Sequence, residues 1–408
     1  MRILFSSSSG AGHFGPVIPF VEALRRRGDD VLVAVPPVRR DQADALGARV
    51  LLLPDPPEAA VAEVWSRVRS GQPASVDREI FAGLNTTAYL PVLERACREW
   101  EPDLVLHEAA EFAGAIAAHR CGIRHAQIAI GLAMVEAGAL EGVTPVLEER
   151  AAGVVEAIRT STYFTRLPGW LDPSSYPDTR RVRVDAGLGK LETLGQRETL
   201  VRRETLGQQE IPGQPENPGE LETLGQRDAL GSAETGPQVF VSFGTVVSSL
   251  PGAAEVYREA LEALRDLPAR AVLTTGGAGA RLGLEPGRGL ALEEIPPNVT
   301  VADWVDQDRM LAAASVVVCH GGAGTTFGAL ENGVPVVVVP FMADQPVNAR
   351  IVTEAGAGLT VEPFADGPLR QRLRTAIETV LRQPSFHRKA TDFARDTAKM
   401  PEIGSAGI

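Results

Sequence analysis

Residues 316–345 read VVVCHGGAGTTFGALENGVPVVVVPFMADQ, and this stretch decides the fold class. Its two apolar, β-branched runs at 316–318 and 336–339 are typical of parallel strands that are covered on both faces. The glycine-rich turn at 321–324 lets backbone N–H groups approach an anion, and the helix that follows favours a phosphate at its N-terminus. The stretch therefore predicts a strand, a diphosphate-binding turn, a helix and a second strand of a doubly wound α/β sheet.

Three polar residues flank this turn and indicate what binds there. His320 comes directly before the glycines, and Asp344 and Gln345 come shortly after the second strand. Carboxylate and amide groups suit sugar hydroxyls, because together they accept and donate hydrogen bonds in a compact space. A helix N-cap role before Pro346 is an open alternative for the last two. A glycine-rich turn alone would be weak evidence, but the histidine before it and the acid and amide residues after the second strand strengthen the prediction of a diphosphate-binding site.

The start of the chain has the same α/β pattern. Residues 1–5 predict a strand, 6–15 a turn, 17–27 a helix and 31–35 the next strand. The turn contains Gly-x-Gly, but the third glycine is misplaced and no acidic residue ends the second strand, so a dinucleotide site is not indicated. His13 stands where this turn meets the helix, and its imidazole suits a general base because it titrates near neutral pH.

An acidic partner for His13 is expected at the end of another strand. Residues 103–107 predict a buried strand, Glu108 follows it, and Glu111 lies one helical turn later. A carboxylate on the second ring nitrogen would fix the tautomer of the imidazole and stabilise its protonated form. Glu108 is the predicted partner and Glu111 the reserve, although Glu111 is equally well explained as a carboxylate at a helix N-terminus. We expect His107 to pack at the strand end.

Several separated motifs carry a family resemblance: the SSSSGAGH turn that ends at His13, SFGT at 242–245, and the stretch 316–345. Their types and order resemble the two-domain (GT-B) glycosyltransferases, specifically the branch that glycosylates small molecules and bacterial natural products. The resemblance implies an α/β chain with two Rossmann-like doubly wound domains facing a cleft. These would be an N-terminal acceptor-binding domain at 1–187 and a C-terminal nucleotide-sugar-binding domain at 237–408.

The resemblance further implies an inverting, metal-independent glycosyltransferase with no cofactor beyond its nucleotide-sugar co-substrate. His13, oriented by Glu108, would deprotonate a hydroxyl of a small-molecule natural product. The nucleobase would stack on the ring of Trp304. The sugar would contact Asp344 and Gln345, called the acid–amide pair below, with Asn348 as a weaker candidate for the same contact. The implied donor-binding residues are Ser242, Thr245, Trp304, Val305, His320, Gly322, Ala323, Gly324, Thr325, Asp344 and Gln345.

Two departures from the family pattern bear on the donor. Asp306 stands where proline is common, which leaves the conformation of that loop open. Gly328 stands where many users of uridine nucleotides have a glutamate that binds ribose hydroxyls, and the nearest acid is Glu331. Such a carboxylate is of less use when the 2′-hydroxyl is absent. The pattern therefore favours a dTDP-sugar donor, with a UDP-sugar as the alternative.

A tandem array of six-residue units such as ETLGQR occupies 192–233, within the interval 188–236 where the family joins its domains. A hexad period invites a left-handed β-helix, but Pro212 and Pro218 replace the leucine that would point inward, and the units are too polar to bury a core. A helix is disfavoured because nearly every unit contains glycine or proline. We predict a disordered, low-complexity linker.

The composition excludes other classes of protein. With 52 acidic and 40 basic residues, the formal charge is −12, which argues against a nucleic-acid partner. Cys97, Cys121 and Cys319 are far apart and lack metal-binding spacing, as expected for reduced core thiols. There is no signal peptide and no apolar run near the ~20 residues of a membrane span, so we expect a soluble, cytoplasmic protein. A homodimer is left open.

The end of the chain predicts one departure from the family fold. Family members usually finish with a helix that crosses back to the N-terminal domain, whereas this sequence stops soon after Met400. We therefore expect the crossover to be missing or abbreviated.

Three other functions fit parts of the pattern. A nucleotide-sugar epimerase on the same fold would bind the donor but would need no base for an acceptor hydroxyl. A noncatalytic auxiliary partner of another glycosyltransferase is disfavoured, because it need not keep His13, a strand-end carboxylate and a full donor motif. Glycosylation of carbon rather than oxygen stays open, since the same base would serve a phenolic acceptor.

Overall fold

The computed structural model describes residues 1–70, 72–184, 236–250, 252–282 and 295–408, and the chain divides into two compact units. The first unit comprises Met1–Lys190 and Asp396–Ile408, and the second comprises Leu191–Arg395. The hexad array at 192–233 lies outside the described residues, so the prediction of a disordered linker there stays a prediction.

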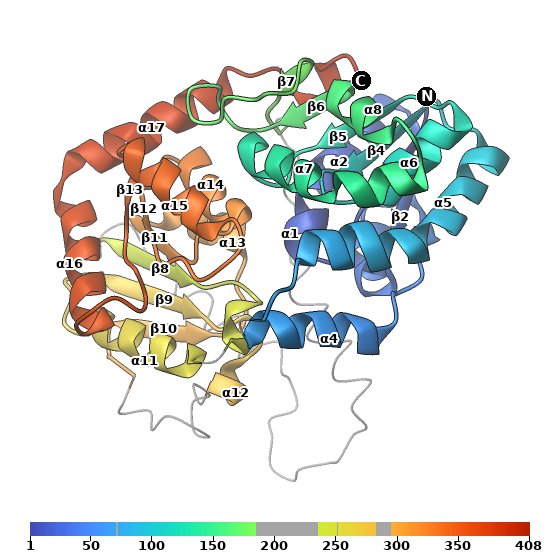
Figure 1. Ribbon diagram of the computed structural model, residues 1–408. Helices are drawn as coiled ribbons and strands as arrows, with labels where there is room; N and C mark the ends of the chain where they lie inside the picture. Colours follow the sequence, from blue (N-terminus) through green and yellow to red (C-terminus); the bar gives the residue numbers. More distant parts are fainter. Residues whose placement is uncertain (71, 185–235, 251, 283–294) are drawn as a thin grey trace, which may run out of the picture. The chain divides into compact units, whose positions relative to one another are not determined.

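The first unit is built on a seven-stranded, all-parallel sheet of order β3-β2-β1-β4-β5-β6-β7 (Figure 1). The central strands are buried, as their apolar runs predicted, and β1 pairs Ile3 with Leu104 of β4. The strands are β1 Arg2–Ser6, β2 Asp30–Val35, β3 Arg49–Leu52, β4 Leu104–Glu108, β5 His125–Ile128, β6 Thr162–Thr165 and β7 Thr179–Arg181.

Helices connect these parallel strands. In α2 the apolar residues fall at helical spacing and turn Phe20, Val21 and Leu24 into the core, and Gly28 ends the helix in the left-handed conformation at φ 95°. Residues Val76–Asn85 form a π-helix that leads directly into α5. The α-helices are α1 Ala11–Phe14, α2 Ile18–Arg27, α3 Arg40–Ala45, α4 Glu58–Arg69, α5 Thr86–Trp100, α6 Phe112–Cys121, α7 Ala133–Arg150 and α8 Val154–Thr160.

The second unit is built on a six-stranded parallel sheet of order β10-β9-β8-β11-β12-β13. Its strands are β8 Gln238–Ser242, β9 Arg270–Thr274, β10 Val299–Ala302, β11 Val316–Cys319, β12 Val336–Val338 and β13 Gly358–Thr360. Its helices are α11 Ala253–Leu264, α12 Gly279–Leu282, α13 Gln307–Ala313, α14 Ala323–Glu331, α15 Gln345–Glu354, α16 Leu369–Arg382 and α17 Pro384–Ala398.

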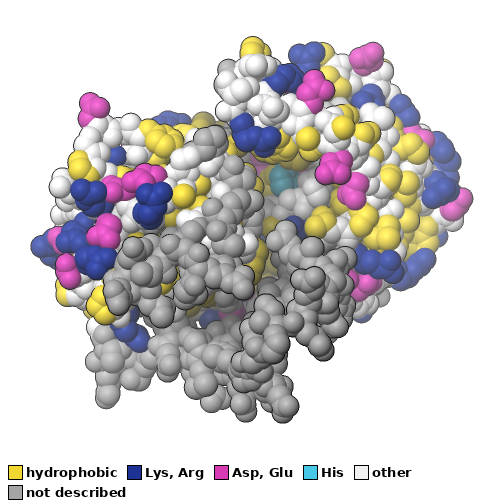
Figure 2. Space-filling model, turned by 90° about the horizontal axis from the view of Figure 1, so that it is seen from below, with side chains coloured by type: hydrophobic (Ala, Val, Ile, Leu, Met, Phe, Trp, Pro, Cys, Tyr) yellow, Lys and Arg dark blue, Asp and Glu magenta, His cyan; other side chains and the backbone are white. Residues whose placement is uncertain are grey.

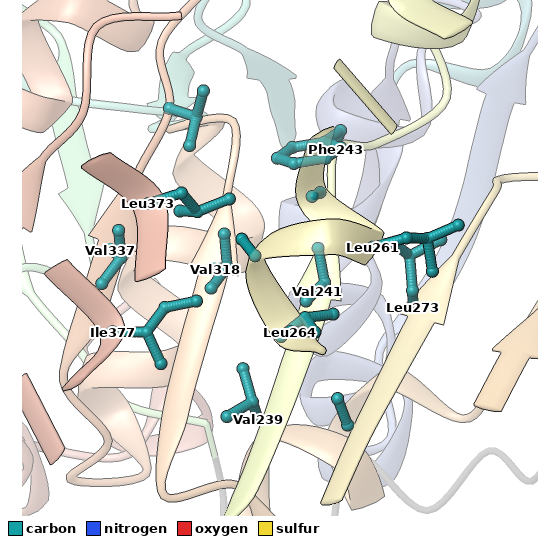
Figure 3. Packing of buried hydrophobic residues seen from close by; sticks show 14 of the residues in the cluster. Val239, Val241, Phe243, Leu261, Leu264, Leu273, Val318, Val337, Leu373 and Ile377 are labelled. Atoms are coloured by element: carbon teal, nitrogen blue, oxygen red, sulfur yellow. The ribbon is translucent and has the colours of Figure 1, made fainter. Parts of the chain in front are cut away.

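The core of the second unit lies between its sheet and the helices α11 and α16. Apolar side chains of the strands meet those of the two helices (Figure 3), namely Val239, Val241, Leu273, Val318 and Val337 from the sheet and Leu261, Leu264, Leu373 and Ile377 from the helices. All of these side chains are buried, so the hydrophobic effect holds the strand ends in fixed positions.

Both sheets have the strand order 3-2-1-4-5-6 of the doubly wound fold, with β7 added in the first. In this order the chain leaves the sheet in opposite directions after the first and fourth strands, which creates a switch point between their carboxyl ends. The switch points lie between β1 and β4 in the first unit and between β8 and β11 in the second. The predicted fold class is thus confirmed for each unit.

The C-terminal segment differs from the predicted second domain, which was expected to extend over 237–408. Asp396–Ile408 belong to the first unit, and the boundary falls inside α17. Arg183 donates its backbone N–H to Pro401 at 3.0 Å, accepts from Ile403 at 3.2 Å, and forms an ion pair with Glu402 at 2.8 Å. Figure 1 shows this end of the chain, in red, beside β7. Of the two expected alternatives, a missing returning segment is therefore wrong, whereas an abbreviated one stays a prediction.

The visible surface carries charges of both signs, and the cysteines form no disulfide among the described residues. On the face seen in Figure 2, Lys and Arg side chains alternate with Asp and Glu over the described residues. All three cysteines are free thiols, and Cys97 and Cys319 are buried. Within the described ranges, no helix is both long and apolar enough to span a membrane.

Candidate functional site

The switch point of the first unit holds the predicted imidazole–carboxylate pair. His13 lies in α1, which begins five residues after β1 ends, and Glu108 is the last residue of β4. The Nδ1 atom of His13 lies 3.0 Å from Oε1 of Glu108. The contact exists because β1 and β4 are neighbours, so their carboxyl ends meet at one edge of the sheet. Its catalytic role stays a prediction.

Hydrogen bonds keep Glu108 charged although it is fully buried. Its Oε1 also accepts from the hydroxyl of Ser8 at 2.8 Å, and its Oε2 accepts from the N–H of Ala110 at 2.7 Å. Burial alone would raise the pKa of Glu108, but the charge and hydrogen bond of His13 and these donors lower it below its ordinary value. An ionised carboxylate only accepts, so Nδ1 of His13 carries the proton and Nε2 is the basic nitrogen.

The surroundings of His13 raise its basicity and fix its ring. Burial alone would lower the pKa of His13, but the charge and hydrogen bond of Glu108 outweigh burial and raise it, with smaller contributions from Asp77 and Glu136. The ring of Phe81 lies 4.9 Å away, centroid to centroid. A Cβ atom at Gly10 would lie 2.6 Å from the imidazole, so a larger residue there would displace the ring. The side chain is 20% exposed, which leaves it within reach of a substrate.

Glu111 serves the helix rather than His13. Its carboxylate caps α6 by accepting the N–H groups of Ala113 at 2.8 Å and Gly114 at 3.0 Å, and it accepts a short hydrogen bond from the hydroxyl of Ser6. Burial raises its pKa to about 7. The alternative explanation as a helix N-terminal carboxylate thus describes its contacts, and the sequence could not decide because both roles require an acid after the strand.

His107 is part of the interior. Its Nε2 lies 3.2 Å from Nδ1 of His125 on the neighbouring strand β5, and the side chain is fully buried. Burial lowers the pKa of His107 to about 4, so the ring is neutral in ordinary buffers. It packs at the strand end, as expected.

The switch point of the second unit holds His320 between glycines. His320 follows β11, and Gly244 follows β8 by one residue. A Cβ atom at Gly244 would lie 2.8 Å from the imidazole, and one at Gly322 would lie closer still. Burial lowers the pKa of His320 to about 4, against a smaller raising contribution from the backbone of Ser242, and among the described residues its buried Nδ1 has no partner at hydrogen-bond geometry. A neutral ring with an unsatisfied nitrogen is therefore held beside the glycine-rich turn.

The helix after this turn begins without a side-chain cap. Gly322 is the N-cap residue of α14 and has no side chain to accept a hydrogen bond, and the first intrahelical bond runs from Thr326 N–H to the Gly322 carbonyl at 3.0 Å. The N–H groups of Ala323, Gly324 and Thr325 come before that bond, as they do at any helix start. Gly324 is exposed, whereas Thr325 is buried. This arrangement suits an anion such as a diphosphate.

Trp304 follows β10 and lies against a glycine turn after β9. A Cβ atom at Gly277 would lie 3.0 Å from the indole nitrogen, so only glycine lets the ring lie this close. The indole is 37% exposed, and Val305 beside it is half-buried. Asp306, where the family has proline, caps α13 by accepting the N–H of Arg309 at 3.1 Å. The departure thus leaves a regular helix start.

The acid–amide pair lies at the start of α15. The Gln345 side-chain oxygen accepts the N–H groups of Phe341 at 2.8 Å and Met342 at 3.1 Å, and Gln345 is buried. Asp344 occupies the N-cap position, but its side chain accepts no capping hydrogen bond from the backbone N–H groups of α15. Its carboxylate instead accepts a hydrogen bond from Asn348 at 2.7 Å.

The two remaining predicted donor contacts lie at the carboxyl end of β8, the strand next to β11. Ser242 is the last residue of that strand and is buried, and Thr245 is exposed. In the described part of the chain, no three His, Cys, Asp or Glu side chains are gathered in a way that could hold a metal ion.

Family models match both units. The model of the erythromycin biosynthesis protein CIII-like N-terminal domain matches residues 69–154, and that of the corresponding C-terminal domain matches residues 271–404. The second match includes Trp304, His320 and the acid–amide pair.

Known proteins are similar along most of the chain. The demethyllactenocin mycarosyltransferase of Streptomyces fradiae is 30% identical, over 88% of this chain and 75% of that protein. The tylactone mycaminosyltransferase of the same organism is 29% identical, over 89% and 82%. Among solved structures, the glycosyltransferase VinC in complex with dTDP superposes with a TM-score of 0.68 at 21% identity, over 99% of this chain and 97% of that one.

Proposed function

Because this chain belongs to the bacterial natural-product glycosyltransferases of the GT-B fold, we propose that it transfers a sugar from a dTDP-sugar to a hydroxyl of a small natural product. That it is a glycosyltransferase follows from the family; the donor, the stereochemistry and the roles of single residues are the proposal. The observation that carries it is the His13–Glu108 hydrogen bond of 3.0 Å at the switch point of the first sheet.

His13 acts as the general base. An acceptor hydroxyl is a poor nucleophile near neutral pH, and its oxygen gains nucleophilicity as Nε2 of His13 takes the proton. Glu108 holds the ring through Nδ1 and stabilises the imidazolium that forms. The acceptor oxygen forms a bond to the anomeric carbon while the bond from that carbon to the diphosphate breaks. A single displacement of this kind inverts the configuration at that carbon.

The second unit holds the donor. The diphosphate accepts hydrogen bonds from the uncapped start of α14 and from His320, whose Nδ1 has no partner among the described residues. These groups stabilise the negative charge of the departing diphosphate, so we propose that the transfer requires no metal ion. Trp304 stacks on the base, and Asp344 with Gln345 contacts the sugar hydroxyls.

Gly328 supports dTDP over UDP as the carrier. It lies in the second turn of α14 and offers no carboxylate for ribose hydroxyls. A Cβ atom there would lie 3.1 Å from Cδ1 of Leu311, so a larger residue would require the end of that side chain to move by a few tenths of an ångström. A deoxyribose donor needs no carboxylate at this place. The complex of VinC with dTDP is consistent with this choice.

The test combines binding and turnover. Calorimetric titration of the purified protein with dTDP and with UDP should show tighter binding of dTDP. The His13→Ala variant should bind dTDP as the wild type does and should release no nucleotide from a dTDP-sugar in the presence of an acceptor that the wild type glycosylates. Tighter binding of UDP would indicate a UDP-sugar as the donor in place of a dTDP-sugar. Full turnover by the variant would show that His13 is not the general base. If the protein raised another transferase's turnover without any of its own, it would be an auxiliary partner.

A further inference from the structure

Asn348 is fully buried in the first turn of α15 and joins two separate turns of the chain. Its side-chain N–H₂ donates to the backbone carbonyl of Gly321 at 2.8 Å and to the carboxylate of Asp344 at 2.7 Å. Gly321 follows His320 in the glycine-rich turn, whereas Asp344 belongs to the loop after β12. One amide group therefore connects the turn assigned to the diphosphate with the residue assigned to the sugar.

Close packing makes these two turns one body. Gly321 has a φ of +92°, and a Cβ atom there would lie 2.8 Å from the Val338 side chain and 3.0 Å from the Gln345 carbonyl oxygen. Glycine is thus required at 321 both by its backbone conformation and by the closeness of α15. The hydrogen bond of Asn348 to the Gly321 carbonyl runs across this contact.

The loop before Asp344 is held in a strained conformation. Ala343 has a φ of +56°, in the left-handed region that residues with a Cβ atom rarely adopt. Two hydrogen bonds from Phe341 and Met342 to the Gln345 side chain fix the backbone next to it. Strain of this kind persists where the surroundings determine the conformation, and it is concentrated in functional loops. The position of Asp344 is therefore set by the surrounding contacts.

The Asn348 side chain is oriented by what it donates. Its Oδ1 is buried and has no hydrogen-bond partner among the described residues. Reversing the amide would place that oxygen against a carbonyl and a carboxylate, both of which are acceptors, so the observed orientation is the favourable one. A buried, unsatisfied oxygen destabilises the fold, and an apolar side chain would avoid it. The two donated hydrogen bonds are what asparagine adds at this position.

We propose that Asn348 is a positioning residue that orients the Asp344 carboxylate toward the donor sugar and keeps it in register with the diphosphate turn. This corrects the expectation that Asn348 itself contacts the sugar, because both of its N–H groups are used inside the protein. The inference rests on the proposed donor site. It predicts that loss of the Asn348 side chain lowers the additional affinity that the sugar gives to the donor, while the affinity for the nucleoside diphosphate alone stays the same.

The experiment measures the affinity of dTDP and of dTDP-glucose by calorimetry in the wild type and in Asn348→Ala. In the wild type, dTDP-glucose should bind more tightly than dTDP. In the variant, the affinity for dTDP should stay within about threefold, and the additional affinity of dTDP-glucose should fall about tenfold or disappear. Asn298→Ala is the matched control. Asn298 donates to backbone carbonyls of Leu264 at 2.9 Å and Ala269 at 3.0 Å just before β10, at the opposite end of that strand from Trp304.

A double-mutant cycle with Asp344→Ala separates positioning from general damage. If Asn348 acts through Asp344, the double variant should lose no more sugar affinity than Asp344→Ala alone, whereas additive losses would overturn the proposal. Asn348→Ser, which can still donate one hydrogen bond, serves if the alanine variant does not fold.

A thermal transition lowered in Asn348→Ala with the sugar contribution unchanged would show a merely structural role. A wild type that binds dTDP but gains nothing from the sugar would also overturn this inference, yet it would leave the proposed donor nucleotide intact; binding of neither dTDP nor UDP would instead count against the proposed function.

Discussion

Each unit places a histidine at its switch point, after the first strand in the first unit and after the fourth strand of the order in the second, and the two histidines have opposite properties. In each six-strand order the histidine lies at the switch point, His13 after β1 and His320 after β11. His13 has a buried carboxylate at 3.0 Å, and the charge of Glu108 raises its pKa despite burial. His320 lies among glycines, and burial lowers its pKa to about 4. The fold supplies the position, and the neighbouring residue decides the charge.

The difference matches the chemistry that each histidine is proposed to do. A base must take up a proton during the reaction, and a carboxylate neighbour stabilises the cation that forms. A ring beside a diphosphate needs only to donate, so a neutral imidazole serves, and a carboxylate next to it would repel the ligand. Glycines around His320 would let backbone N–H groups and the ring approach the same anion in the proposed donor site. Each neighbourhood is therefore suited to one role and unsuited to the other.

The largest effect should come from making the first site resemble the second. Glu108→Gln keeps the size of the side chain but removes the charge that holds His13 in its reactive tautomer. We expect turnover to fall by about 10²- to 10⁴-fold, as for the loss of general base catalysis. The pKa of His13 should fall as well, because the negative charge that raises it is gone. In the proposed mechanism His13 must be neutral to accept the proton, so the acid limb of kcat/KM should move to lower pH.

NMR titration of the six histidines gives a readout for this prediction that needs no acceptor. The His13 signal, assigned with His13→Ala, should titrate at higher pH in the wild type than in Glu108→Gln. Glu111→Gln is the control, because Glu111 hydrogen-bonds Ser6 and α6 and not His13. An unchanged His13 pKa in Glu108→Gln would show that the pair does not set the basicity of the ring.

A smaller effect is expected at the second site. His320→Ala should weaken binding of dTDP-glucose by about 10- to 100-fold, the size of a hydrogen bond to a charged group of about 1.5–3 kcal/mol. Because the pKa of His320 is about 4, the ring is neutral across the working range, so the affinity of the wild type should be nearly constant between about pH 5.5 and 8. The nucleotide sugar is the right probe, since free dTDP has a terminal phosphate that titrates near pH ~6. Affinity that rose steeply on acidification would mean that His320 binds as a cation and would break the contrast with His13.

The fold was predictable because the strands that form its centre are buried on both faces. The strands predicted from 1–5, 31–35, 103–107, 316–318 and 336–339 coincide with strands of the observed sheets to within one residue at each end. Their burial requires apolar residues without alternation, which is a strong and local signal. The end of the chain was misjudged because the expectation rested on how few residues follow Met400, whereas these few residues already bond to Arg183 of the first unit. Asp396–Ile408 therefore counted with the wrong unit.

The contact between His13 and Glu108 could be predicted because both follow strands that a doubly wound sheet places side by side. The remaining neighbours of His13 could not. Ser8 lies in a run of four serines, and nothing in the sequence distinguishes the one whose hydroxyl reaches the carboxylate. Phe81 reaches the ring from a π-helix, whose wider turn breaks the spacing by which helical faces are recognised. The link made by Asn348 depends equally on tertiary packing.

The smallest effect concerns the choice of nucleotide. Gly328→Glu introduces the carboxylate that users of uridine nucleotides direct at ribose hydroxyls. The start of α14 and His320 before it stay unchanged. The new Cβ atom would lie 3.1 Å from Leu311, so that side chain must shift by a few tenths of an ångström. We expect the ratio of the UDP to the dTDP dissociation constant to fall by about three- to tenfold, mainly through tighter UDP binding, because only ribose offers the second hydroxyl. Calorimetry with both nucleotides checks this, and Gly328→Gln, equal in shape but uncharged, is the control. If both nucleotides weaken equally, the position is limited by packing against Leu311, and the absence of a carboxylate there says nothing about the donor.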